Sequence, residues 1–90
     1  MISRELNASS GRNGKDLINR PPFPATQYNS CSLHSQHLRD IYGIEKFRNL
    51  ERINLSCNSI QSIEPVVNLR NLRVLIASYN QVSFNFYISV

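Results

Sequence analysis

The most chemically versatile side chains in this 90-residue sequence are two cysteines and two histidines. Cys31, His34 and His37 follow one another at intervals of three residues, and Cys57 lies further along the chain. Thiolate and imidazole groups are the ligands that zinc prefers, and a cysteine beside a histidine can also form a nucleophilic pair. These residues therefore raise two alternatives, a metal site and a catalytic thiol.

Whether these side chains can act together depends on the elements that carry them, and the sequence changes character near residue 27. Residues 1–27 are punctuated by glycine and proline and show no sustained period of 2 or 3.6. They are predicted to form a disordered arm. Within it, the stretch Pro21-Pro22-Phe23-Pro24 favours polyproline II geometry, and a short docking segment for an aromatic groove is the alternative interpretation.

From Tyr28 onward the apolar residues recur with a period of 22 residues, which is typical of a repeat architecture. Repeats are predicted at 28–49, 50–71 and, incomplete, 72–83. The first copy is divergent. The other two carry the structural repeat positions Leu50, Ile53, Leu55, Asn58, Ile60, Ile63 and Leu69, and then Leu72, Leu75, Asn80 and Val82.

Each repeat is predicted to form a short strand, a turn and a compact return segment. Ile53 and Leu55 are two residues apart and therefore share the inward face of a strand. A single unit cannot bury its apolar side, so neighbouring units must stack into a parallel sheet over a continuous core. Asn58 and Asn80 interrupt the apolar pattern, and we expect their side-chain amides to bond the backbone where each strand ends. Gln36 departs from this pattern in the first copy.

The segment Leu50–Glu64, LERINLSCNSIQSIE, resembles the 22-residue leucine-rich repeats typified by the nuclear regulatory subunit of protein phosphatase 1 and by axonemal dynein light chain 1. The resemblance covers about residues 28–83. It implies an α/β fold, a leucine-rich repeat solenoid with short parallel strands on the concave face and short helical or 3-10 return segments outside. It also implies a protein without enzymatic activity.

The repeat register argues against both chemical alternatives. Cys31 falls on the inward position equivalent to Ile53 and Leu75, where a free cysteine behaves as a small apolar residue. His34 falls on an outward position equivalent to Ser56. No orienting group or pocket accompanies a Cys–His pair. We therefore expect no catalytic residue, no metal and no cofactor.

The outward strand positions are the candidate partner-binding residues, since the concave face of a solenoid is where partners usually bind. They are Arg52, Asn54 and Ser56 in one repeat and Val74, Ile76 and Ser78 in the next, with Ser30, Ser32 and His34 in the first. Val74 and Ile76 would expose two branched aliphatic side chains. Such exposure indicates either a contact patch or scattered surface residues.

Residues 84–90 do not continue the period. Phe84, Phe86 and Ile88 alternate with polar residues, and the apolar tail is not the polar cap that a repeat array needs. One hypothesis is that the chain is a truncated product of a longer repeat protein without independent function. Others are that the tail folds back as a cap, or that Ile88-Ser89-Val90 is a ligand for a PDZ groove.

Composition narrows the function classes. The net charge of +4 is mild, no cluster of Lys and Arg appears, and no apolar run approaches the length of a membrane span. The leading expectation is a protein-interaction module or regulatory subunit of the phosphatase-regulator, ciliary or centrosomal type, located in the cytoplasm, nucleus or cilium. The alternative is a ribonucleoprotein scaffold like the U2 snRNP A-prime protein, which contacts RNA only indirectly.

Overall fold

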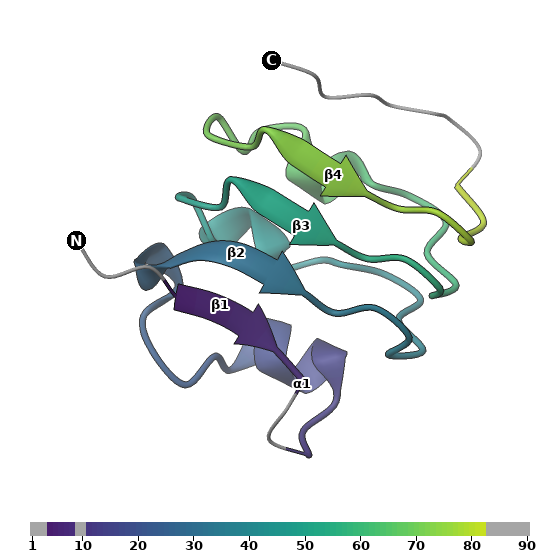
Figure 1. Ribbon diagram of the computed structural model, residues 1–90, viewed down its shortest axis with the longest axis horizontal. Helices are drawn as coiled ribbons and strands as arrows, with labels where there is room; N and C mark the ends of the chain where they lie inside the picture. Colours follow the sequence, from purple (N-terminus) through teal and green to yellow (C-terminus); the bar gives the residue numbers. More distant parts are fainter. Residues whose placement is uncertain (1–3, 9–10, 83–90) are drawn as a thin grey trace.

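A computed structural model describes residues 4–8 and 11–82 of the chain, and within them four short strands form one parallel sheet. The strands lie side by side in sequence order: β1 (Arg4–Asn7), β2 (Tyr28–Ser32), β3 (Arg52–Asn54) and β4 (Val74–Ile76) (Figure 1). The connections carry helix α1 (Gly14–Asn19) and the 3-10 helices η1 (Ala25–Gln27), η2 (Ile44–Lys46) and η3 (Glu64–Val66). The fold is a small α/β domain.

The strand register repeats along the sheet. Cys31 pairs with Ile53, which in turn pairs with Leu75, and both steps are 22 residues. Backbone hydrogen bonds beyond the strands follow the same spacing: the Leu33 amide donates to the Asn54 carbonyl at 2.9 Å, and the Leu55 amide to the Ile76 carbonyl at 2.7 Å. Consecutive turns of the chain therefore place equivalent residues side by side.

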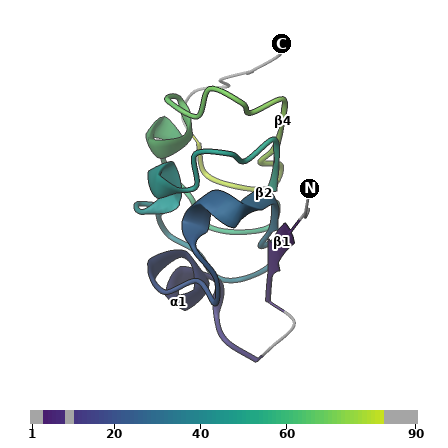
Figure 2. The same ribbon diagram turned by 90° about the vertical axis from the view of Figure 1, so that its left-hand side faces the viewer.

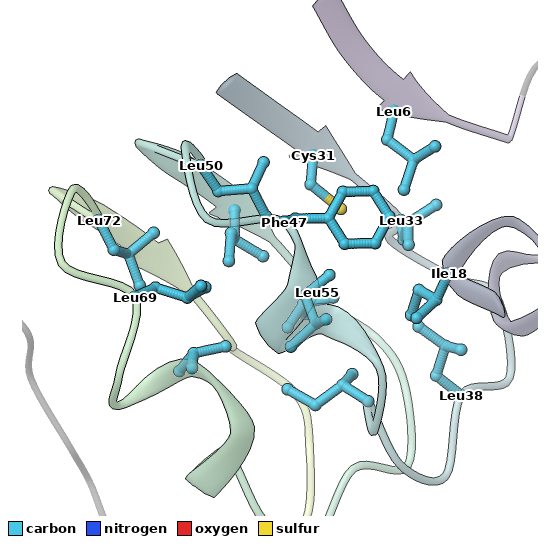
Figure 3. Packing of buried hydrophobic residues seen from close by; sticks show 14 of the residues in the cluster. Leu6, Ile18, Cys31, Leu33, Leu38, Phe47, Leu50, Leu55, Leu69 and Leu72 are labelled. Carbon is cyan, nitrogen blue, oxygen red and sulfur yellow. The ribbon is translucent and has the colours of Figure 1, made fainter. Parts of the chain in front are cut away.

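The core lies between the sheet and the helical segments, which occupy the opposite side of the coil in Figure 2. Phe47 packs its ring edge-on against Tyr28, with centroids 5.7 Å apart. In Figure 3, side chains from the strands and from the return segments point into the same interior. Among the apolar repeat positions, Leu75 and Val82 are partly buried. The others are buried: Leu50, Ile53, Leu55, Ile60, Ile63, Leu69 and Leu72.

Asn58 joins two turns through its side-chain amide. Its Oδ1 accepts from the backbone amides of Gln36 at 2.9 Å and Leu38 at 3.0 Å, and its Nδ2 donates to the carbonyls of Leu33 and Leu55 at 3.0 and 2.8 Å. A third bond from Nδ2 reaches the Ser56 carbonyl at 3.2 Å. The amide thus satisfies backbone groups that have left the strand ladder, as the sequence predicts.

Asn80 repeats this arrangement one turn later. Its Oδ1 accepts from the Ile60 amide at 3.0 Å, and its Nδ2 donates to the Leu55 and Ala77 carbonyls at 2.8 and 3.1 Å. The Gln36 side chain, by contrast, donates to the carbonyl of His34 at 3.3 Å. Gly14 of α1 approaches Gln36 so closely that an added Cβ would lie 3.0 Å from the Gln36 Cβ.

Left-handed backbone conformations recur with the same spacing. Ser35, Cys57 and Tyr79 have φ values of 56°, 60° and 59°, each one residue before the amide position of its turn. Non-glycine residues adopt this region at a steric cost because Cβ crowds the carbonyl oxygen. The turn geometry imposes that cost in every copy.

The prediction of a disordered arm over 1–27 is wrong for residues 4–8 and 11–27. β1 adds to the edge of the sheet beside β2, with Leu6 paired with Cys31, and Leu6 is buried in the common core. The 22-residue period does not reach β1 because this step is longer. Arg4 pairs with Tyr28 and Leu6 with Cys31, and the register shifts between Arg4 and Glu5.

Helix α1 fastens the amino-terminal segment to the core. Asn13 caps it by accepting from the Asp16 amide at 2.8 Å, and Leu17 and Ile18 are buried. The Asp16 carboxylate accepts from Arg12 at 2.7 Å and from Arg20 at 2.8 Å. These hydrogen bonds, first that of Arg12 and then that of Arg20, hold the pKa of Asp16 below its ordinary value.

Two lysines connect α1 and its C-terminal residue to the next turn of the chain. Lys15 forms an ion pair with Asp40, which lowers the pKa of that carboxyl, and donates to the Tyr42 carbonyl at 2.9 Å. Lys46 donates to the Asn19 carbonyl at 3.1 Å. The amino-terminal segment is therefore part of the same folded body.

The proline stretch is also held by the fold. The Phe23 amide donates to the Tyr28 hydroxyl at 3.2 Å, and the Arg4 guanidinium lies 3.5 Å from the centroid of the half-exposed Phe23 ring. The stretch for which a docking role is the alternative interpretation therefore has contacts within its own chain. The tail at 84–90, including the PDZ hypothesis for Ile88-Ser89-Val90, lies outside the described residues.

Candidate interaction surface

The outward face of the sheet brings together the predicted partner-binding residues from three strands, and β1 adds a fourth column. The register places Glu5, Ser30, Arg52 and Val74 in one row across the strands. A second row, two residues further along each strand, contains Asn7, Ser32, Asn54 and Ile76. Neighbouring strands lie about 4.8 Å apart, so each row is a short ladder of adjacent side chains.

The first row changes from acidic to cationic to aliphatic. Glu5 is exposed and its carboxylate accepts from the Ser30 hydroxyl at 3.3 Å and from the Asn7 amide at 3.2 Å. Arg52 is exposed, and no hydrogen bond or ion pair engages its guanidinium within the described residues. Val74 follows on the next strand and is half-buried.

The second row ends in the most exposed aliphatic side chain of the face. Ile76 is 41% exposed, next to Asn54 on β3. The Asn54 Oδ1 is held by the backbone amide and the hydroxyl of Ser56, at 3.0 and 2.8 Å. Asn54 and Ser56 therefore form a fixed polar element, with Ile76 protruding beside it.

His34, Ser56 and Ser78 extend the face beyond the strand ends. His34 and Ser78 are exposed and Ser56 is half-buried. A hollow of about 180 Å³ lies over the middle of the sheet and is lined from Glu5 on one side to Val74 and Ile76 on the other. The face is thus a continuous shallow surface suited to contact with another molecule.

The cysteines and histidines are not brought together. Cys31 is buried at 1% exposure on the inward side of β2, while His34, His37 and Cys57 are exposed. Burial, with a smaller contribution from Glu5, raises the pKa of the Cys31 thiol to about 12, so its reactive thiolate is disfavoured. No group of three or more potential metal ligands occurs in the part of the chain that the structure describes.

Glu5 and Asn7 are members of the face that sequence reasoning missed. The available signal was Leu6-x-Ala8, two apolar residues two apart, which is the inward pattern of a strand. The pattern is too short to stand out alone, and it lies off the 22-residue period. With Leu6 pointing inward, Glu5 and Asn7 must point outward.

The chain was compared with protein-family models, with curated proteins and with solved structures, and none of them matches it. Among the described residues, no helix is long and apolar enough to cross a membrane.

Proposed function

We propose that this chain is a leucine-rich repeat solenoid that acts as a protein-interaction module or regulatory subunit, with the outward face of its sheet as the binding surface. The 22-residue steps between Cys31, Ile53 and Leu75 support the repeat assignment. The matching amide hydrogen bonds of Asn58 and Asn80 support it independently.

The observation that carries the binding role is an unpaired cation beside the half-buried Val74 and the exposed Ile76. Arg52 has no side-chain partner among the described residues, and Val74 and Ile76 stand on the neighbouring strand. A desolvated contact could use both, since protein interfaces combine apolar cores with arginine. Binding rather than catalysis is proposed because Cys31 is buried, which raises the pKa of its thiol, whereas His34 and His37 are exposed. The cytoplasm stays the predicted location.

The test is a bulky substitution on the outward face of the sheet, with a matched substitution in the helical layer as the control. Ser32→Trp would fill the centre of the face, and Val67→Trp would add the same bulk to an exposed position after η3. We expect proteins captured from cell extract by the wild-type chain to be lost with Ser32→Trp and retained with Val67→Trp. Circular dichroism would first establish that both variants are folded.

Ribonuclease treatment of the extract separates this proposal from a ribonucleoprotein scaffold. Partners that bind the protein directly survive the treatment. Capture that is identical with Ser32→Trp and the wild type would contradict the proposed surface, and loss of every partner after ribonuclease would contradict a direct protein-interaction module.

A further inference from the structure

The charges of the outward face are separated rather than neutralised. Glu5 and Arg52 occupy the same row but lie two strands apart, about 10 Å, with Ser30 between them. This separation is close to the Debye length at physiological ionic strength, so the two exposed charges interact weakly. Glu5 already accepts hydrogen bonds from Ser30 and Asn7, whereas Arg52 has none within the described residues.

The aliphatic end of the face lies one strand beyond Arg52. Val74 pairs with Arg52 in the sheet register, and Ile76 is two residues further along the same strand. A side chain that contacts Val74 and Ile76 therefore lies about 5 Å from one that contacts Arg52. The face presents, in order, an acid, a hydroxyl, a cation and an aliphatic pair.

An α-helix that crosses the strands has a matching period. One helical turn rises about 5.4 Å, close to the spacing of about 4.8 Å between strands, and side chains three or four residues apart share a helix face. A helix of about 10–12 Å diameter also fits the length of these strands, which have three to five residues at about 3.3 Å per residue. Successive turns of such a helix would meet successive strands of the sheet.

We propose that this surface binds an amphipathic helix of a partner protein that carries a carboxylate over Arg52 and an aliphatic side chain, one turn away, over Val74 and Ile76. Two turns from the carboxylate, on the other side, a basic residue faces Glu5. A carboxylate and a guanidinium carry opposite charges, and their geometry allows two parallel hydrogen bonds. The acid–cation order of the row fixes the direction of the helix. This inference rests on the proposed function of the sheet face.

The experiment is a display selection from a library of helix-forming peptides in which three positions, spaced one turn apart, are randomised. The full chain is the bait. We expect peptides with Asp or Glu one turn from Leu, Ile or Val to be enriched. With Arg52→Glu as bait, the preferred residue at the acidic position should become Lys or Arg while the aliphatic residue is kept.

Affinity measurements on a selected peptide sharpen the result. Arg52→Glu should weaken binding of the acidic peptide at least tenfold, as expected for loss of a charge-assisted hydrogen bond and its replacement by repulsion. Arg48→Glu makes the same charge change on an exposed residue just after η2, and we expect less than a twofold effect. Thermal unfolding of each variant would show that it is folded.

The outcomes separate the inference from the proposed function. Binders that Ser32→Trp weakens but that show no acidic preference, or do not respond to Arg52→Glu, would overturn the inference and leave the binding surface standing. If Ser32→Trp weakens the binding of no recovered peptide, both the inference and the proposed binding surface are contradicted.

Discussion

The amino-terminal segment and the later turns build one sheet by different means. From residue 28 to residue 82, each step of 22 residues returns the chain to the same place, and an asparagine amide ties one turn to the next. Between Leu6 and Cys31 the step is longer and carries helix α1, and the ion pair of Lys15 with Asp40 links this segment to the next turn. A parallel sheet with regularly spaced strands can therefore be extended at its first strand by a segment that does not follow the same spacing.

The largest difference between the two regions should appear when the asparagine is removed. Asn58→Ala leaves the buried amide of Leu38, the buried carbonyl of Leu33 and the partly buried amide of Gln36 without their partner. Unpaired buried groups cost roughly 1–3 kcal/mol each, and we expect a loss of about 3–5 kcal/mol. Urea unfolding would measure it.

Asn80→Ala is the matched control. Asn80 is only partly buried, and its Oδ1 accepts one backbone amide instead of two. We expect a loss of about 1–2 kcal/mol for this variant. Equal losses for the two substitutions would mean that the additional bond to Gln36 and the deeper burial of Asn58 add nothing.

The attachment of the amino-terminal segment can be broken at Leu17. This side chain of α1 is 1% exposed, and Leu17→Ala should lower the free energy of unfolding by about 2–4 kcal/mol through lost burial and the cavity left behind. Val67→Ala, at a site that is 44% exposed, should change it by less than about 0.5 kcal/mol. A Leu17→Ala variant as stable as the wild type would show that residues 11–27 are a detached arm in solution.

A substitution at the left-handed backbone position of Cys57 should change the free energy of unfolding by less, and should raise it. Cys57 adopts φ of 60°, a region that asparagine tolerates better, so Cys57→Asn should stabilise the protein by about 0.5 kcal/mol. Ser59→Asn, two residues away and outside that region, should be neutral. Thermal unfolding of both variants tests the difference, and destabilisation by Cys57→Asn would contradict the role assigned to the backbone.

The smallest effect is expected in the pH dependence of the free energy of unfolding. The folded-state pKa of Asp16 is lowered by the hydrogen bonds of Arg12 and then Arg20, so its contribution to stability is present above the unfolded pKa of about 3.9 and is lost as pH falls through the folded value. Asp16→Asn should therefore flatten the decline of stability below about pH 4.

Unfolding measured from pH 6 to pH 2 would detect this change in slope. Glu64→Gln provides the control, since this carboxylate is exposed and has no side-chain bond within the described residues. A decline equally steep in Asp16→Asn and in the wild type would show that the Arg12–Asp16–Arg20 cluster contributes nothing.

Periodicity was enough to place the side chains of the later turns. Ile53 and Leu55 alternate with Arg52 and Asn54, so inward and outward positions follow from the strand geometry alone. Asn58 could be given its bonding role because an amide in an apolar column must find polar partners.

The amino-terminal segment could not be placed in this way. Its signals were local, Leu6-x-Ala8 for the strand and Asn13 with Asp16, Leu17 and Ile18 for a capped helix, and none lies on the 22-residue period. On the binding face, the sequence identified Arg52 as outward. The sequence could not show that the Ser56 hydroxyl donates a hydrogen bond to Asn54 while the Arg52 guanidinium has no partner among the described residues. Both facts depend on side-chain positions.

The reach of Asn58 has a consequence for local opening of the chain. The amide protons of Gln36 and Leu38 are held by a residue about twenty positions later in sequence, so their exchange with solvent requires the following turn to open. Opening therefore spreads between neighbours instead of staying within one turn. Exchange rates at these two amides report on residues 55–60, and a ligand that orders β3 would slow them without touching either one.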